Sequence, residues 1–319
     1  MQALSKFCCQ NKRYPDYEKR GANNLTVCGW FGKNNHIRLL YCRTCKSRFS
    51  ERKGTPLFRM KLPEKKAISL LEHLSESCGV RKTERLVGVN RNTVMRYARL
   101  AGEHAKALHD ELVAFSPQTN EVQFDEKWAF VGKKEQHCHG PEAVDSKQGD
   151  NWDHVAYDPE HRLVVSVVPG KRTAKNIKKL GLDFKQRTQG RRMNLMTSDE
   201  YKPHKKALLK AYGRTVKPPR TGKRGRPKGS HLMAAPGLTY ATVHKTRRKG
   251  RVVKITLRAV FGSKAQVAAA IATSAVSNTV NTAFVERHNG TDRNRNARKV
   301  RKSYCFSKDG EIHNAMTYP

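Results

Sequence analysis

The stretch that decides the fold of this chain is residues 121–131, which read Glu-Val-Gln-Phe-Asp-Glu-Lys-Trp-Ala-Phe-Val. Apolar side chains recur at positions 122, 124, 128 and 130, the period of two that is typical of a β-strand. Asp125 falls on the face opposite Phe124. The pattern therefore predicts a strand that packs on a core with one face and presents a carboxylate on the other.

The elements expected after this strand follow a definite order. Strand-like runs at 153–157 and 163–168 precede an amphipathic helix over 173–184, a buried strand over 193–200 and a helix over 201–212. Three strands, a helix, a strand and a helix, with acids on the first strand and at the end of the fourth, form the RNase H-like arrangement. The first and fourth strands lie side by side there, so we expect Asp125 and Asp199 to lie close together.

A third carboxylate is expected from a long helix near the end of the chain. Val276, Val280 and Phe284 recur at i, i+4 and i+8, which predicts an apolar ridge, and Glu286 lies just off it. Basic residues surround Glu286, so the alternative is that it only balances charge. Its interpretation as a metal ligand rests on its pairing with Asp125 and Asp199, because Mg²⁺ prefers hard oxygen ligands.

The charge of the chain indicates the class of partner. Among 319 residues, 64 are Lys or Arg and 27 are Asp or Glu, which gives a net charge of +37. No apolar run approaches the ~18 residues of a membrane span, and the first residues lack the apolar run of a secretory signal. We therefore expect a cytoplasmic, nucleoid-associated protein with no membrane contact, whose partner is double-stranded DNA. Small-molecule metabolism explains such a charge poorly.

The cysteines are concentrated at the start, since five of the eight lie in the first 45 residues. Cys42 and Cys45 have the C-x₂-C spacing that binds zinc, and this predicts a zinc-ribbon-like domain over residues 1–58. The second ligand pair is less defined. Cys9 and Cys28 are the candidates, with Cys8 and His36 as further possibilities. The alternative is that all are reduced thiols in a basic domain.

Residues 60–114 have helical periodicity throughout. Ala67, Leu70, Leu71 and Leu74 predict one amphipathic helix, and a short helix follows over 81–87. A glycine turn then leads to Asn90, a favourable N-cap for a third helix. That helix would bury Val94, Tyr97, Ala98 and Ala101 and would expose the DNA-binding candidates Arg91, Asn92, Arg96 and Arg99. The order predicts a helix-turn-helix that reads DNA; the alternative is a three-helix bundle with a solvated basic face.

Several motifs together resemble the insertion-sequence-one family of bacterial transposases. They are Phe124-Asp125-Glu126-x-Trp128, Thr197-Ser198-Asp199, Glu286-Arg287-His288-Asn289 through Arg293, and Phe306-Ser307-Lys308, with Tyr41-Cys42-Arg43-Thr44-Cys45 and Gly54-Thr55-Pro56-Leu57-Phe58 upstream. The resemblance covers most of the chain. It implies an α+β multidomain protein with a zinc ribbon, a helix-turn-helix and an RNase H-like catalytic core over residues 118–319.

The same resemblance implies an activity and its residues. It places a DDE triad at Asp125, Asp199 and Glu286, which would bind Mg²⁺ or Mn²⁺ for DNA strand cleavage and transfer. Glu126 and Glu200 are not expected as ligands. Contacts to DNA are expected from Arg287, Asn289, Arg293, Arg298 and Arg301. The partners would be terminal inverted repeats and target DNA, bound by a homodimer or larger synaptic complex.

Two departures from the family pattern define the alternatives. The first is a basic insertion over about 214–262. It contains Arg224 and Arg226 in a stretch that resembles an AT-hook; the alternative is that this stretch is a solvated linker. A hairpin packed beside the core is expected after it. Family members continue through a final helix where this chain reaches Pro319, which predicts a truncated copy. The alternative function is thus a catalytically decayed, sequence-specific DNA-binding protein or repressor. A packaging protein that uses charge alone would not explain three acids on these elements.

Overall fold

The computed structural model describes residues 3–33, 36–113, 118–138, 147–218 and 229–318. The chain forms two compact units, Met1–Glu111 with Tyr318–Pro319, and Leu112–Thr317. The predicted segment 1–58 and the predicted helical segment as far as Glu111 fall in the first unit. No helix in the described part of the chain combines the length and the apolar character needed to span a bilayer.

The first unit begins with a small antiparallel sheet. Its strands lie in the order β1 (Leu25–Phe31), β2 (Ile37–Cys42) and β3 (Arg48–Ser50). Cys9, Cys42 and Cys45 belong to its small buried cluster together with Leu25, Leu40 and Phe49. A core this small provides little burial energy, so a bound metal would contribute much of its stability.

Three helices follow in the same unit, namely α1 (Glu64–Ser75), α2 (Val80–Val87) and α3 (Arg91–Leu112). Gly88 ends α2 in the left-handed conformation, with φ of 65°. Asn90 Oδ1 then accepts a hydrogen bond from the amide of Asn92 at 2.8 Å, which confirms the predicted N-cap. Val94, Tyr97 and Ala98 are buried, as predicted.

The second unit is built on a six-stranded mixed sheet. The strand order is β11-β10-β7-β4-β5-β6. The bounds are β4 (Glu121–Val131), β5 (Gly149–Asp158), β6 (Leu163–Gly170), β7 (Leu195–Asp199), β10 (Tyr240–Arg248) and β11 (Arg251–Phe261). β7 runs parallel to both β4 and β10, whereas the other neighbours are antiparallel. The adjacency of the first and fourth strands of this unit, β4 and β7, is thus confirmed.

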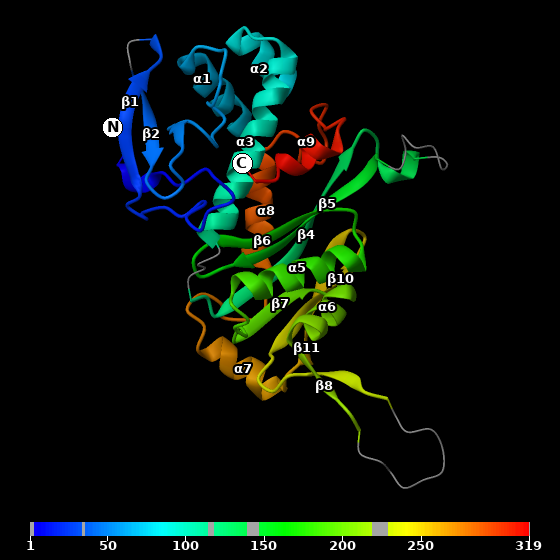
Figure 1. Ribbon diagram of the computed structural model, residues 1–319. Coiled ribbons are helices and arrows are strands. Elements are labelled where there is room, and N and C mark those ends of the chain that lie inside the picture. Colours follow the sequence, from blue (N-terminus) through cyan, green and yellow to red (C-terminus); the bar gives the residue numbers. More distant parts are fainter. Residues whose placement is uncertain (1–2, 34–35, 114–117, 139–146, 219–228, 319) are drawn as a thin grey trace. The chain divides into compact units, whose positions relative to one another are not determined.

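Helices cover both faces of this sheet (Figure 1). On one face, α5 (Ala174–Arg187) and α6 (Pro203–Tyr212) bury Leu180, Phe184 and Leu208 against the strands. On the other face lie α7 (Lys264–Ala272) and α8 (Ala283–Arg295), with Val285 packed on Val155 and Tyr157 of β5. A short α9 (Gly310–Ala315) and a two-stranded ribbon, β8 (Gly213–Val216) with β9 (His231–Ala234), complete the unit.

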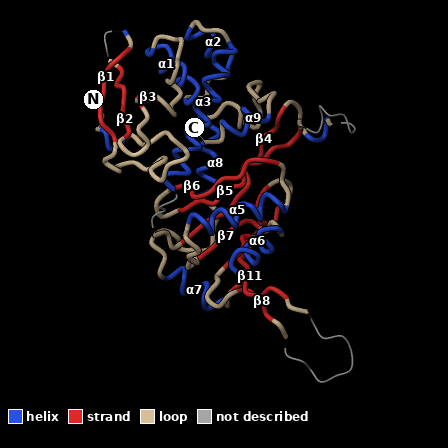
Figure 2. Tube along the Cα trace, viewed as in Figure 1, coloured by secondary structure: helices blue, strands red, loops and turns tan. Residues whose placement is uncertain are grey.

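The hairpin predicted after residue 238 is present as β10 and β11, and its place beside the core is specific: β10 pairs directly with β7, so the hairpin extends the main sheet. One sequence prediction about this unit was wrong. The apolar ridge from Val276 does not form one long helix, because a loop joins α7 to α8 (Figure 2). Ser274 Oγ accepts hydrogen bonds from the amides of Val276 and Ser277, and such side-chain bonds compete with helix formation.

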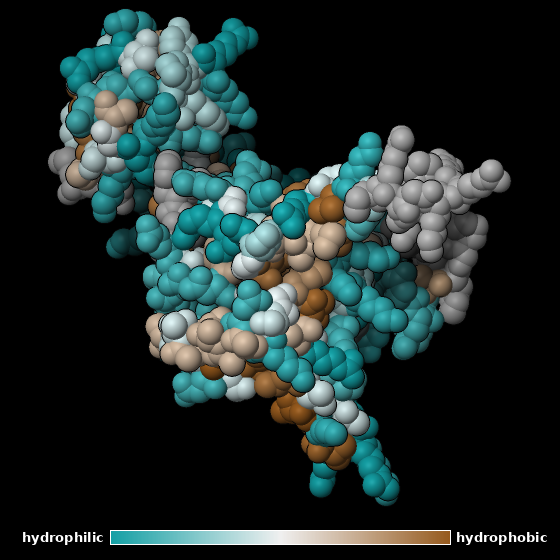
Figure 3. All heavy atoms as spheres, turned by 90° about the horizontal axis from the view of Figure 1, so that it is seen from below, coloured by the Kyte–Doolittle hydropathy of each residue, from teal (hydrophilic) through white to brown (hydrophobic). Residues whose placement is uncertain are grey.

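The surface of the chain is largely hydrophilic, with hydrophobic patches on the face seen in Figure 3. Among the apolar side chains exposed in the second unit are Val253, Ile255 and Leu257, which alternate along the edge strand β11. Basic residues lie between and beside them, including Lys254 and Arg258.

Candidate functional site

Two of the predicted acids lie next to each other on adjacent strands. Phe124 of β4 pairs with Ser198 of β7, so Asp125 and Asp199, each one residue further on, occupy neighbouring positions. Phe124 points into the hydrophobic core and Asp125 points to the opposite face, as the alternation predicted. The two carboxylates therefore face the side of the sheet that α8 covers.

The third acid, Glu286, lies in the first turn of α8. A carboxylate is favourable there because the helix dipole is positive at its N-terminus. Thr282, the residue before α8, joins this acid to Asp199: its hydroxyl lies 2.7 Å from Glu286 Oε1 and 3.4 Å from Asp199 Oδ1. Lys245 of β10 forms an ion pair with Glu286, and its Nζ lies 3.8 Å from Asp199 Oδ1. Asp125, Asp199, Glu286 and their shared partners are called the acid cluster below.

Polar contacts hold α8 against β4 and thereby fix the acid cluster. Alternate residues of the strand each contact the helix: Gln123 Oε1 accepts from the amide of Val285 at 3.0 Å, Asp125 Oδ2 accepts from Asn289 Nδ2 at 2.7 Å, and Lys127 pairs with Asp292. Every second residue of β4 thus contacts a residue three or four positions further along α8, so that strand and helix are in contact over two helical turns. Gly290, within α8, does not interrupt the helix.

The pKa values of the three acids differ with their surroundings. Burial raises the pKa of Asp125 to about 6, and the nearby charges of Asp199 and Glu286 act in the same direction. Burial also raises the pKa of Asp199, although Lys245 opposes it. Burial would raise the pKa of Glu286 too, but its hydrogen bonds with Lys245 and Thr282 outweigh that effect and lower it. A cation bound beside Asp125 would relieve the repulsion between this carboxylate and the other two.

The donor set of the acid cluster fits a hard divalent ion. Its ligands are carboxylate oxygens, and about half of the Asp199 and Glu286 side chains is exposed, 47% and 46% respectively, so an ion from solvent can reach them. The acids do not, however, form a closed cage. Within the described residues, the group whose ligand atoms all lie within 4.8 Å of one another is that of Cys9, Cys42 and Cys45.

The neighbouring acids have partners of their own. Glu126, on the opposite face of β4 from Asp125, contacts His204 at 2.5 Å and Arg172 at 2.8 Å. Burial would raise the pKa of Glu126, but these two partners outweigh it and lower the pKa. Glu200 forms ion pairs with His244 and Arg258. These contacts give both residues structural roles.

The predicted DNA-binding residues are placed in different ways. The side chains of Arg91, Asn92, Arg96 and Arg99 are exposed on α3, opposite its buried residues, and Arg287 and Arg301 are also exposed. Arg293 and Arg298 are partly buried, and Arg298 donates to Ser307 Oγ at 3.1 Å. Arg224 and Arg226, with the core of the AT-hook-like motif, lie outside the described residues.

Asn289 differs most from its predicted role as a DNA contact. It is only 2% exposed and donates its hydrogen bond to Asp125. Its position three residues after Glu286 turns it towards the sheet, because residues three apart on a helix lie on nearly the same face. Asn289 therefore orients a carboxylate of the acid cluster.

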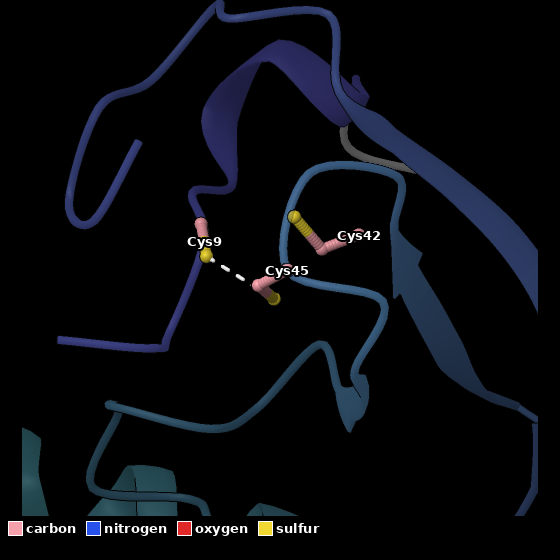
Figure 4. A group of neighbouring side chains, drawn as sticks. All are labelled: Cys9, Cys42 and Cys45. Carbon is pink, nitrogen blue, oxygen red and sulfur yellow. Dashed lines mark hydrogen bonds between the residues drawn. The ribbon is translucent and has the colours of Figure 1, made fainter. Parts of the chain in front are cut away.

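The cysteine cluster contains three of the four predicted zinc ligands (Figure 4). Cys9, Cys42 and Cys45 are buried, and the sulfur atoms of Cys9 and Cys45 are 3.5 Å apart. Burial would raise the pKa of Cys45, but hydrogen bonds from Ser47 outweigh it and lower the pKa to about 7, which favours the thiolate that binds metal.

The prediction that Cys28 is a fourth ligand was wrong. Cys28 is exposed on β1, and its sulfur contacts the carbonyl oxygen of Leu39 at 3.4 Å. The register of β1 shifts between Val27 and Gly29, which the sequence did not indicate. Cys8 is buried, but its sulfur accepts from Gln10 at 3.3 Å, and His36 contacts Arg52 and Glu64.

One group of ionisable residues was missed at the sequence level. Asp153 of β5 contacts Lys299 at 2.9 Å and Lys127 at 3.1 Å, and Lys299 lies 3.0 Å from His313. All four side chains are at most 3% exposed. With Asp292 they form what is called the buried network below. The only available signal was an acid with no assigned role on a predicted strand, because Lys299 is one of many basic residues nearby.

Similarity to known proteins is low. No protein-family profile matches the chain, and neither does any curated protein. One similar solved structure is the crystal structure of the Mos1 strand transfer complex, with 15% identity and a TM-score of 0.20 over 48% of this chain and 57% of that chain. Another is the Mos1 transposase paired-end complex with left transposon end, with 13% identity and a TM-score of 0.19 over 48% and 59%. The chain thus spans less than two thirds of these structures, and the function proposed below rests on its own geometry.

Proposed function

We propose that the chain is the transposase of an insertion sequence, which binds transposon ends and catalyses metal-dependent DNA cleavage and strand transfer. The observation that carries this proposal is the convergence of Asp125, Asp199 and Glu286. They come from β4, the end of β7 and the start of α8 and are more than 70 residues apart in sequence. Thr282 and Lys245 each contact both Asp199 and Glu286, and Asp125, held by Asn289, occupies the position on β4 next to that of Asp199 on β7.

Asp125, Asp199 and Glu286 would hold Mg²⁺ or Mn²⁺ in this proposal. Bound divalent ions would supply activation of water or of a DNA 3′-hydroxyl and stabilisation of the leaving oxygen. The chain's own groups would orient the ligands: Asn289 holds one oxygen of Asp125, and Thr282 contacts both Asp199 and Glu286. The strand order β6-β5-β4-β7-β10 supports an RNase H-like core over residues 118–319.

DNA recognition is assigned to the first unit in this proposal. The helix α2, the turn at Gly88 and the helix α3 have the order of a helix-turn-helix, within residues 60–114. The exposed side chains of Arg91, Asn92, Arg96 and Arg99 would enter the major groove. Arg287, Arg293 and Arg301 would bind phosphates, and a homodimer would bring two transposon ends together.

Zinc is the metal proposed for the cysteine cluster of residues 1–58. Three buried thiols suit Zn²⁺, and the metal would compensate for the small core around them. The zinc content of the purified chain, measured by mass spectrometry, should be close to one per chain. Cys45→Ser should lose it, whereas Cys28→Ser should keep it. Equal zinc content in both variants would contradict the assignment.

The enzymatic proposal is tested on a supercoiled plasmid that carries the DNA flanking the coding sequence. With Mg²⁺ or Mn²⁺ the wild type should cleave at the element ends, and Asp125→Asn, Asp199→Asn and Glu286→Gln should abolish cleavage while DNA binding in a gel-shift assay is unchanged. Glu200→Gln, next to Asp199, is the matched control and should retain cleavage. Equal cleavage by the wild type and Asp125→Asn would overturn the proposal. Binding without cleavage by the wild type would favour the decayed repressor.

A further inference from the structure

Lys245 is a cation inside the acid cluster that the proposed chemistry does not use. It lies on β10, a strand that the sequence predicted only as part of a hairpin beside the core. Val243 of β10 pairs with Asp199, and Lys245, two residues later, lies on the same face of the sheet. The extension of the main sheet by β10 therefore brings this side chain to the acids.

The ammonium group of Lys245 contacts the oxygens that a metal would need. It forms an ion pair with Glu286 Oε1, lies 3.5 Å from Thr282 Oγ1 and lies 3.8 Å from Asp199 Oδ1. Glu286 Oε1 also contacts Thr282, so this oxygen is already shared by two partners. A divalent ion bound to both Asp199 and Glu286 would have to replace these contacts.

The electrostatics of Lys245 agree with this geometry. The amine of a lysine has an ordinary pKa of about 10.4, and Lys245 is paired with Glu286, so this group is charged at neutral pH. Two cations a few ångströms apart in one pocket repel each other strongly, even with partial screening. A bound divalent ion and an ammonium in its present position therefore disfavour each other.

We propose that Lys245 is the resident counter-ion of the acid cluster, which a divalent metal displaces when it binds. This inference rests on the proposed function, because it requires that Asp125, Asp199 and Glu286 bind the metal. Lys245 is then a positioning residue: without metal it keeps Asp199 and Glu286 together against their mutual repulsion, and it sets the metal concentration at which the site fills.

The side chain of Lys245 could move to an exposed region at the end of β10 when a metal displaces it. Lys245 is 22% exposed, and the residues after it on β10, Thr246 and Arg247, are exposed. A lysine stem with four rotatable carbons can turn the ammonium from the pocket to this basic rim. There it would meet a DNA phosphate beside the metal site, so that metal loading and DNA binding reinforce each other.

The test is a titration of the full chain with Mn²⁺, in which electron paramagnetic resonance measures the concentration of the free ion. Lys245→Met removes the competing charge and should bind Mn²⁺ about tenfold more tightly than the wild type. Lys245→Arg keeps the charge and should bind Mn²⁺ like the wild type. Lys254→Met is the matched control, because Lys254 is exposed on the same hairpin and pairs with Thr246 across it.

The outcomes separate this inference from the proposed function. Asp125-dependent Mn²⁺ binding by the wild type, with unchanged or weaker binding by Lys245→Met, would overturn the role of Lys245 and leave the metal site intact. A wild type that binds no Mn²⁺, or binds it equally well with Asp125→Asn, would overturn the proposed function itself. Tighter Mn²⁺ binding by Lys245→Met, without a change for Lys254→Met, would support the role of Lys245 as the counter-ion.

Discussion

Two groups of charged residues lie on the same face of β4, and their charges are arranged in opposite ways. The buried network around Lys127 pairs two lysines with Asp153 and Asp292, so its charges balance. The acid cluster around Asp125 has three carboxylates, and among the described residues the ammonium that contacts Asp199 and Glu286 is that of Lys245. The two groups are only two residues apart on the strand.

The balanced charges of the buried network stabilise the fold, whereas the unbalanced charges of the acid cluster suit the binding of a cation. Balanced charges at most 3% exposed, as for Lys127, Asp153 and Lys299, hold β4, β5 and the segment after α8 together. The unbalanced acids are partly exposed, and burial and repulsion raise the pKa of Asp125 to about 6. A site whose charges repel in the absence of ligand costs stability and is suited to binding a cation from solution.

The largest effect should come from breaking the buried network. Lys299→Met leaves the fully buried Asp153 with Lys127 as its cation and with the hydroxyl of Thr317, and removal of one partner of a buried ion pair costs about 3–5 kcal/mol. Urea unfolding should show this loss in the second unit. Lys302→Met, on an exposed lysine nearby, should change the free energy of unfolding by less than about 0.5 kcal/mol. If Lys299→Met lowered the free energy of unfolding by less than about 1 kcal/mol, the buried network would not have the stabilising role that distinguishes it from the acid cluster.

The acid cluster should respond in the opposite direction. Asp125→Asn removes a charge that folding disfavours, so in metal-free buffer at pH 7.5 it should raise the free energy of unfolding by about 1–3 kcal/mol. The pKa of Asp125 in the folded chain, about 6, is above the ordinary value of 3.8 for an aspartate, so ionisation costs stability as the pH rises through this range. The gain should therefore shrink at pH 5. A variant less stable than the wild type at pH 7.5 would contradict the assignment.

A smaller effect should appear in the acid sensitivity of the buried network. Burial lowers the pKa of His313 from 6.5 to about 3, and Lys299 acts in the same direction. The contribution of neutral His313 is therefore complete above pH 6.5 and is lost as the pH falls towards 3. His313→Gln keeps an acceptor for Lys299 without this titration. Its stability relative to the wild type should improve by about 2 kcal/mol between pH 7.5 and pH 5. Parallel pH profiles would show that His313 does not titrate as described.

Local patterns were sufficient to predict most elements of the fold. Alternation predicted β4 and the side on which Asp125 lies, and an N-cap with helical spacing predicted α3. The adjacency of β4 and β7 followed from the order of strands and helices. For the strand and the helix the pattern of burial repeats with the period of the element, so the sequence alone contains the signal.

Interactions between distant segments were not predictable in the same way. The pairing of β10 with β7, which places Lys245 among the acids, depends on which sheet edge a hairpin joins, and no local spacing encodes that. The register shift after Val27 that accompanies the exposure of Cys28 is also a property of the strand pair. Asn289 was predicted as a DNA contact because it lies on a basic helix, and only the folded structure shows that it donates a hydrogen bond to Asp125.

One divalent ion should bind to Asp125, Asp199 and Glu286 together. Anomalous diffraction from crystals of the chain soaked in Mn²⁺ is the decisive measurement, because the scattering locates the ion itself. We expect a Mn²⁺ peak within coordination distance of all three carboxylates, with the Lys245 ammonium displaced from Glu286. Mn²⁺ bound elsewhere, with Lys245 still paired to Glu286 under saturating metal, would contradict it.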